Sequence, residues 1–164
     1  MNEQLNKVLQ KQKKQIKEPE KVADDVVQLV GFIIGNEEYA IPILSIQEII
    51  KPIEYTRVPQ VPDHVMGVFN LRGDVIPLIN LRKKFNLQPE NQTDETRYIV
   101  LKGENNIAGF MIDRLTKAIR IKKDRIDPPP ETIHSDNGMI YGIGKQEDKM
   151  ITILRVEALL KRDF

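Results

Sequence analysis

The sequence predicts a mainly β fold, and two observations support this prediction. Short runs rich in Val, Ile, Tyr and Phe recur along the chain, and polar or glycine-containing turns separate them. Pairs of these runs form three units of strand, polar turn and strand, a pattern typical of an all-β sandwich or barrel. Helical spacing of apolar residues is limited to short segments, so we expect few helices.

The strand pairs are distributed over the whole chain. In the first pair, residues 26–34 (VVQLVGFII) precede a turn at 35–38, and residues 39–41 resume a strand that Pro42 ends. Further strands are expected at 53–58, 97–102, 107–112, 117–121, 139–143 and 150–154. Proline cannot donate a hydrogen bond to a sheet, so the three prolines at 128–130 predict a loop.

Two short helices are expected. Residues 43–50 carry isoleucines at near-helical spacing with polar residues between them, which predicts a short amphipathic helix. Residues 156–161 place Val156, Leu159 and Leu160 on one helical face, which predicts a helix near the C-terminus.

The composition divides the chain into two regions. Residues 1–25 are rich in Lys, Gln and Glu and poor in apolar residues, so we expect a polar, flexible tail; the alternative is a short basic amphipathic helix that contacts a membrane or a partner. Residues 26–162 are expected to form the folded region. The polar stretch at 88–95 (QPENQTDE) is a natural seam between two barrel-like halves.

Charge and cysteine content narrow the function classes. The 164 residues contain 25 Lys and Arg against 24 Asp and Glu, so no net positive field attracts nucleic acid or anionic lipid. Cysteine is absent, which excludes disulfides and thiolate metal sites and fits a reducing compartment. No apolar run is long enough to span a bilayer, and no signal-peptide core is present. We therefore expect a cytoplasmic protein without membrane insertion.

No catalytic, cofactor or metal site is expected. The chain has only two histidines, His64 and His134, which are far apart in sequence. No serine lies in a glycine-flanked nucleophile turn, and the Gly142–Lys145 stretch lacks the further glycine and the Ser or Thr of a phosphate-binding loop.

The most informative stretch is residues 67–81, GVFNLRGDVIPLINL. Two apolar runs flank Asn-Leu-Arg-Gly-Asp, and Gly73 tolerates the positive φ that an abrupt reversal needs, so the stretch predicts a hairpin. Arg72 then lies at or beside the turn. A long cation held on a rigid turn suits recognition of another protein surface more than bond-breaking.

This hairpin resembles the signature segment of the CheW family of chemotaxis coupling proteins. Residues 35–49 (GNEEYAIPILSIQEI) resemble that family's N-terminal motif, and Tyr-Gly-Ile-Gly at 141–144 followed by residues 150–160 resembles its C-terminal strand pair and helix. The resemblance extends over residues 27–160. Two features depart from it: Arg97 stands where an apolar residue is expected, and the basic tail precedes the usual family start.

The resemblance implies two packed SH3-like five-stranded β-barrel subdomains with short helices, one of them C-terminal. It implies a non-enzymatic adaptor that links chemoreceptors to the histidine kinase CheA in a cytoplasmic array. One barrel would bind the CheW-like regulatory domain of CheA, and a groove between the barrels would hold the receptor hairpin tip. By resemblance, Ile46, Glu48 and Arg72 lie at or near that groove. Glu48 and Arg72 could pair with each other or bind a helical tip, and Ile46 and Leu71 would add an apolar floor. On residue type alone, Ile46 and Leu71 would instead be core residues.

Two alternatives stay open at this stage. The same fold could serve a coupling protein of a non-flagellar signalling array. A different class would be a small β-barrel enzyme or nucleotide binder, which requires a polar-lined pocket with perturbed titratable groups.

Overall fold

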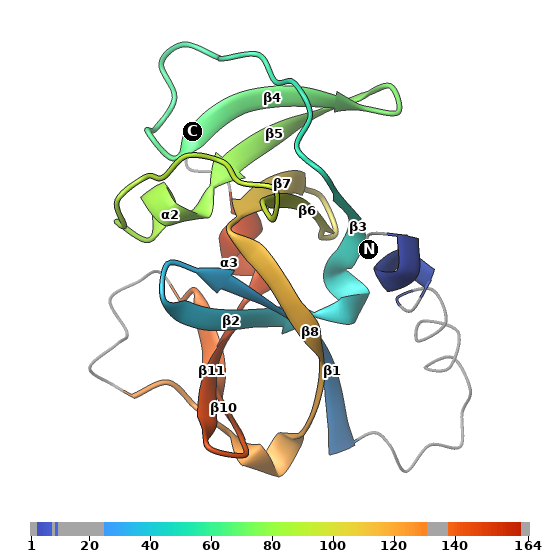
Figure 1. Cartoon of the computed structure of the whole chain (residues 1–164), viewed down its shortest axis with the longest axis vertical. Coiled ribbons are helices and arrows are strands. Elements are labelled where there is room, and N and C mark those ends of the chain that lie inside the picture. The colour runs from blue at the N-terminus through green and yellow to red at the C-terminus, as the bar shows by residue number, and fades with distance from the viewer. Residues whose placement is uncertain (1–2, 8, 10–24, 131–137, 162–164) are drawn as a thin grey trace.

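The computed structural model describes residues 3–7, 9, 25–130 and 138–161, and it confirms the mainly β fold (Figure 1). The strands are β1 (Val26–Ile34), β2 (Glu37–Pro42), β3 (Ile46–Ile50), β4 (Val65–Leu71), β5 (Asp74–Asn80), β6 (Arg97–Lys102), β7 (Ile107–Ile112), β8 (Arg114–Lys122), β9 (Ile126–Asp127), β10 (Ile140–Gln146) and β11 (Lys149–Leu154). The labelled helical segments are η2 (Ile43–Ser45), α2 (Leu81–Lys84), η3 (Lys123–Arg125) and α3 (Val156–Leu160).

These strands form two sheets that match the two predicted subdomains. The six-stranded sheet has the order β8-β1-β2-β11-β10-β9, and the five-stranded sheet has the order β3-β6-β7-β5-β4. Five strands in each subdomain were expected; the larger sheet gains its sixth from the two-residue strand β9. Each sheet is antiparallel except for one parallel pair, β2 with β11 and β5 with β7.

The six-stranded sheet is built from two separate parts of the chain. β1 and β2 begin it, β3 to β7 then build the whole five-stranded sheet, and β8 to β11 return to complete it (Figure 1). The polar stretch at 88–95 was expected to separate the two subdomains, and this expectation is wrong. The stretch lies between β5 and β6, which both belong to the five-stranded sheet. The actual crossings are at η2 and at Asp113.

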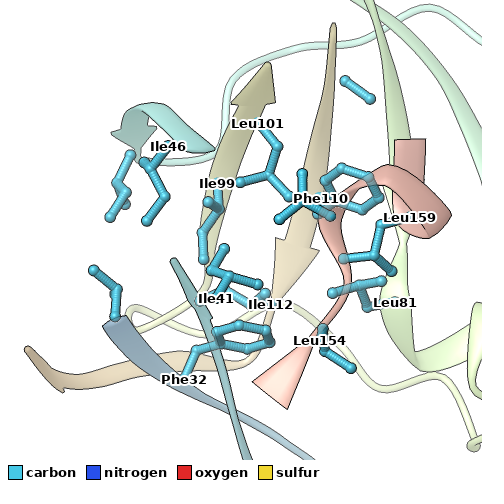
Figure 2. Packing of buried hydrophobic residues seen from close by; sticks show 14 of the residues in the cluster. Phe32, Ile41, Ile46, Leu81, Ile99, Leu101, Phe110, Ile112, Leu154 and Leu159 are labelled. Atoms are coloured by element: carbon cyan, nitrogen blue, oxygen red, sulfur yellow. The ribbon is translucent and has the colours of Figure 1, made fainter. Parts of the chain in front are cut away.

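Three apolar clusters hold the fold together. One lies inside the six-stranded sheet and includes Leu29, Ile119 and Ile151, and a second lies inside the five-stranded sheet and includes Phe69 and Tyr98. The largest cluster, called here the shared core, combines side chains from both sheets and from α3 (Figure 2). Burial of apolar side chains from both subdomains in one cluster makes their separation costly.

The helix predicted at 43–50 is wrong. Residues 43–45 form one 3₁₀ turn, and residues 46–50 form strand β3 with a bulge between Ile46 and Glu48. The turn and the bulge together place Ile43, Ile46 and Ile49 inward at intervals of three, which imitates helical spacing. The C-terminal helix is confirmed as α3.

The strand predicted at 53–58 is reduced to one isolated bridge, between Thr56 and Val68 of β4. Of the predicted tail, the structure describes residues 3–7, 9 and 25; residues 3–7 and 9 are helical, and the side chain of Leu9 is buried in the shared core. The expectation of a flexible tail for residues 10–24 concerns positions outside the described residues.

Candidate protein-binding site

Arg72 lies on a two-residue hairpin turn. β4 and β5 pair up to Leu71 and Asp74, which leaves Arg72 and Gly73 as the whole loop. Both loop residues have positive φ, 52° and 91°, as a type I′ turn requires, and this turn matches the twist of the flanking strands. The Gly73 amide donates a hydrogen bond to Asn70 Oδ1 at 3.0 Å, which further fixes the turn.

Arg72 and Glu48 form an ion pair across the five-stranded subdomain. The Arg72 guanidinium donates from Nη1 to Glu48 Oε1, although the two residues belong to the turn and to the edge strand β3. The Arg72 side chain is 73% exposed and that of Glu48 only 13%. The hydrogen bond to Glu48 raises the pKa of Arg72 above its ordinary value. The cation is therefore presented at the surface in a fixed orientation, over a carboxylate that is mostly covered.

The bulge in β3 explains why Glu48 is available for this pair. Without the bulge, strict alternation from the inward Ile46 would turn Glu48 inward as well. The extra residue lets Ile46 and Ile49 both point into the core, while Gln47 is exposed and Glu48 is half-buried at the surface. Local backbone irregularity thus places the carboxylate under the arginine.

The two apolar residues predicted for the site differ from each other. Ile46 has no exposed surface and belongs to the shared core, so in this conformation it supports β3 from the inside. Leu71 is half-buried beside the turn and packs against the inner cluster of the five-stranded sheet. The structure therefore brings Arg72, Glu48 and Leu71 to the surface region of the hairpin and places Ile46 beneath it.

Sequence reasoning missed a set of exposed apolar side chains on the same subdomain. They are Ile53, Tyr55, Val58 and Val75. Val75 is 67% exposed and lies two residues after Gly73, on β5. No local pattern marks them, since β5 is exposed at Asp74 and Val75 and buried from Ile76 to Asn80.

A second ionic group, called here the Arg82 clasp, links the two subdomains. Arg82 of α2 donates to both carboxylate oxygens of Asp113, from Nε to Oδ1 at 2.9 Å and to Oδ2 at 3.2 Å, and from Nη2 to Oδ2 at 2.6 Å. Asp113 Oδ2 also accepts from the Gly35 amide in the β1–β2 turn at 2.8 Å, and Arg82 Nη1 donates to the Gln88 carbonyl. The hydrogen bond to Asp113 raises the pKa of Arg82.

Arg97, the departure from the family pattern, is buried at the start of β6. Its guanidinium donates to the carbonyl oxygens of Asp94 and Thr96 at 2.8 and 2.7 Å. A long side chain whose charge is directed back onto the loop carbonyls fits an otherwise apolar position. This departure therefore concerns the loop before β6 and leaves the hairpin unchanged.

Sites of other classes receive no support from the described part of the chain. No group of three or more His, Asp and Glu side chains within it is arranged to hold a metal ion. His64 is half-buried before β4, and His134 lies outside the described residues. Within the same residues, no helix has the length and apolar character needed to cross a bilayer.

Comparison with known proteins identifies the family. A model of the CheW-like domain matches residues 28–164. The chain belongs to the CheW-like family. Its CheW-like domain is 62% identical to "Chemotaxis protein CheW" of Helicobacter pylori over 141 residues, which cover 86% of each chain, and 34% identical to the protein of the same name from Bacillus subtilis over 137 residues, which cover 83% and 88%.

A solved structure confirms the architecture of this CheW-like domain. It is the crystal structure of scaffolding protein TtCheW from Thermoanaerobacter tengcongensis, with 31% identity and a TM-score of 0.78, and the match covers 84% of this chain and 94% of that one. The resemblance seen in the hairpin segment is thus confirmed along nearly the whole described region.

Proposed function

We propose that this chain is a chemotaxis adaptor that couples chemoreceptors to the histidine kinase CheA. The observation that carries the proposal is the Arg72–Glu48 pair, which holds an exposed cation on a rigid turn inside a segment that resembles the CheW signature. The names of the relatives support the chemotaxis role, and the structural neighbour's title supports a scaffolding role. The finer assignment of receptor and kinase rests on the family resemblance.

The proposed action is docking without covalent chemistry. The receptor hairpin tip binds in the region of β3 and the Arg72 turn, where the ion pair sets the register and half-buried apolar side chains such as Leu71 supply contact area. CheA binds through its own CheW-like regulatory domain to one of the two barrels. In the cell the protein acts in the cytoplasm, at receptor arrays on the inner face of the membrane.

Rigidity of the turn matters for such an interface. A side chain that is already oriented loses less conformational entropy when a partner binds, so more of the contact energy appears as affinity. Arg72 is oriented from two directions, by the type I′ backbone and by Glu48. A longer or looser loop would present the same charge without this advantage.

Reconstitution with CheA and a receptor signalling fragment tests the proposal. Addition of the chain is expected to raise CheA autophosphorylation and to make the three proteins co-sediment. Arg72→Glu places a carboxylate beside Glu48 and reverses the presented charge, so we expect about a tenfold or greater loss of receptor binding and of kinase activation. Arg120→Glu is the matched control, because Arg120 is exposed on β8 of the other subdomain.

Two results would contradict the proposal. Unchanged kinase output together with failure of both partners to co-sediment would reject the adaptor assignment. Equal losses in the Arg72 and Arg120 variants would show that net charge, and not the hairpin, determines the coupling. Thermal unfolding of each variant must remain cooperative for the comparison to hold.

A further inference from the structure

The N-terminal helix packs on the domain that follows it. Residues 3–7 and 9, called here the N-terminal helix, lie ahead of the family match, which begins at residue 28. Yet Leu9 is only 3% exposed and belongs to the shared core, and Leu5 packs against the same cluster. That cluster contains Ile43 of η2 and Ile46 of β3, and Figure 1 draws the helix beside these two elements.

The contact has the form of a helix docked by one face. Leu5 and Leu9 are four residues apart, so they lie on the same side of a helix. Glu3, Gln4 and Lys7, which occupy other positions around the helix, are exposed. The surface formed by η2 and β3 thus accepts an amphipathic helix that presents two apolar side chains at this spacing.

We propose that the N-terminal helix is an intramolecular occupant of a helix-binding surface at η2 and β3, and that a receptor helix must displace it to bind. The inference rests on the proposed function, which places the receptor tip at the same edge strand. Glu48, which pairs with Arg72, lies two residues from Ile46 on that strand. A receptor helix placed along β3 and the Arg72 turn would overlap with the N-terminal helix at this edge strand, so the two compete for the same space.

The described contacts suit an exchangeable occupant. A helix of this length is marginally stable by itself in water, so it depends on docking for its structure. Among the described residues of the helix, Leu5 and Leu9 make its apolar contact with the core. Fifteen residues, 10–24, separate it from residue 25 in the sequence, so docking is intramolecular and does not depend on protein concentration.

Competition has a calculable effect on binding. The apparent dissociation constant of a partner equals its intrinsic value divided by the fraction of molecules whose surface is uncovered. If the helix covers the surface nine-tenths of the time, the receptor segment binds about tenfold more weakly than it would to an uncovered surface. Release of the helix is therefore expected to strengthen receptor binding.

Full-length variants test the proposal through binding of a fluorescently labelled receptor hairpin fragment. Leu9→Glu places a charge in the apolar contact and releases the helix, so its affinity is expected to rise by up to about tenfold, with Leu9→Ala giving a smaller rise. Gln4→Glu adds the same charge at an exposed position of the same helix and is expected to bind like the unaltered chain. An unchanged or weaker affinity of Leu9→Glu would overturn the competition while the proposed function stands.

A second measurement does not depend on any receptor. Amide chemical shifts of β3 (Ile46–Ile50) are expected to change in Leu9→Glu and to stay constant in Gln4→Glu, because only the first variant removes the docked helix. Constant β3 shifts in both variants would overturn the inference. Failure of every variant to bind the receptor fragment would instead reject the proposed function, and with it the competition, while the shifts would still report whether the helix docks.

Discussion

At the scale of single residues, Arg72 combines an unfavourable backbone conformation with an exposed charge. Its φ of 52° lies in the left-handed region, which arginine enters less readily than asparagine or glycine. Residues held in such conformations cluster at functional sites, where the surrounding structure stabilises them. Here the flanking strand pairs and the hydrogen bond to Glu48 do so. This combination fits the binding role proposed for Arg72 better than a role in turn stability.

This explanation predicts that a substitution at residue 72 can weaken binding without lowering the stability of the fold. Asparagine is favoured at the first position of a type I′ turn, so Arg72→Asn is expected to leave the melting temperature unchanged or to raise it by about 1–4 °C. The same variant loses the presented cation, and receptor binding is expected to fall by about tenfold. Calorimetry and the receptor binding assay measure the two effects. A clear drop in melting temperature would show that the pair with Glu48 is mainly structural.

At the scale of elements, the sequence predicted strands well wherever alternation was regular. β1, β6 and β7 were expected with the observed bounds, because each has a run of branched or aromatic residues bounded by a polar turn. The failure at 43–50 has a physical cause: a 3₁₀ turn and a bulge replaced the period of two with a period of three. Such irregularities depend on the partner strand β6, which a local pattern does not contain.

Closure of the five-stranded subdomain depends on a close backbone approach at Gly67. The segment after β3 returns to β4 through the Thr56–Val68 bridge, with N–H···O distances of 2.8 Å in both directions. Gly67 precedes this bridge at a bulge in β4 and has a φ of 154°. A Cβ added to Gly67 would lie 2.8 Å from the Thr56 carbonyl carbon. That overlap involves backbone on both sides, so no side chain can move to relieve it.

Gly67→Ala is therefore expected to destabilise the fold by about 3 kcal/mol or more, through overlap with the backbone and an unfavourable φ. Urea unfolding followed by circular dichroism measures the change. Gly103→Ala is the matched control. A Cβ there would lie 3.0 Å from the flexible end of Leu160 and at an ordinary 3.9 Å from the Asn106 carbonyl oxygen, so its cost should stay below about 1 kcal/mol. Similar losses of stability in the two variants would mean that the backbone at Thr56 can move away from residue 67 at little cost.

At the scale of the whole molecule, the family resemblance proposed residues for the site, whereas their contacts depend on how distant segments pack. Arg72 and Glu48 were proposed for the site through family resemblance, and a pair between them was one of two alternatives. The structure has that pair because the turn and β3 meet across the subdomain. The Arg82 clasp had no local signal at all, because Arg82 and Asp113 are 31 positions apart. Contacts of this kind follow from how two sheets pack, and that packing is set by many side chains together.

The Arg82 clasp is predicted to couple the two subdomains energetically. The Arg82 and Asp113 side chains are only 11% and 27% exposed, and two parallel hydrogen bonds join them, so loss of one partner leaves a poorly solvated charge. In a double-mutant cycle of Arg82→Met and Asp113→Asn, we expect a coupling energy of about 1–3 kcal/mol from urea unfolding. Asparagine keeps an oxygen that can accept from the Gly35 amide, so the cycle isolates the ionic contact.

The matched control is the exposed ion pair of Lys145 and Asp127, which lies within the six-stranded sheet. Its Nζ and Oδ2 atoms are 3.0 Å apart. Its cycle, Lys145→Met with Asp127→Asn, should give less than about 1 kcal/mol, because water screens both charges. A larger coupling for the clasp than for this pair follows from its lower exposure and paired geometry. Equal coupling in the two cycles would leave the shared core as the contact that fixes one subdomain against the other.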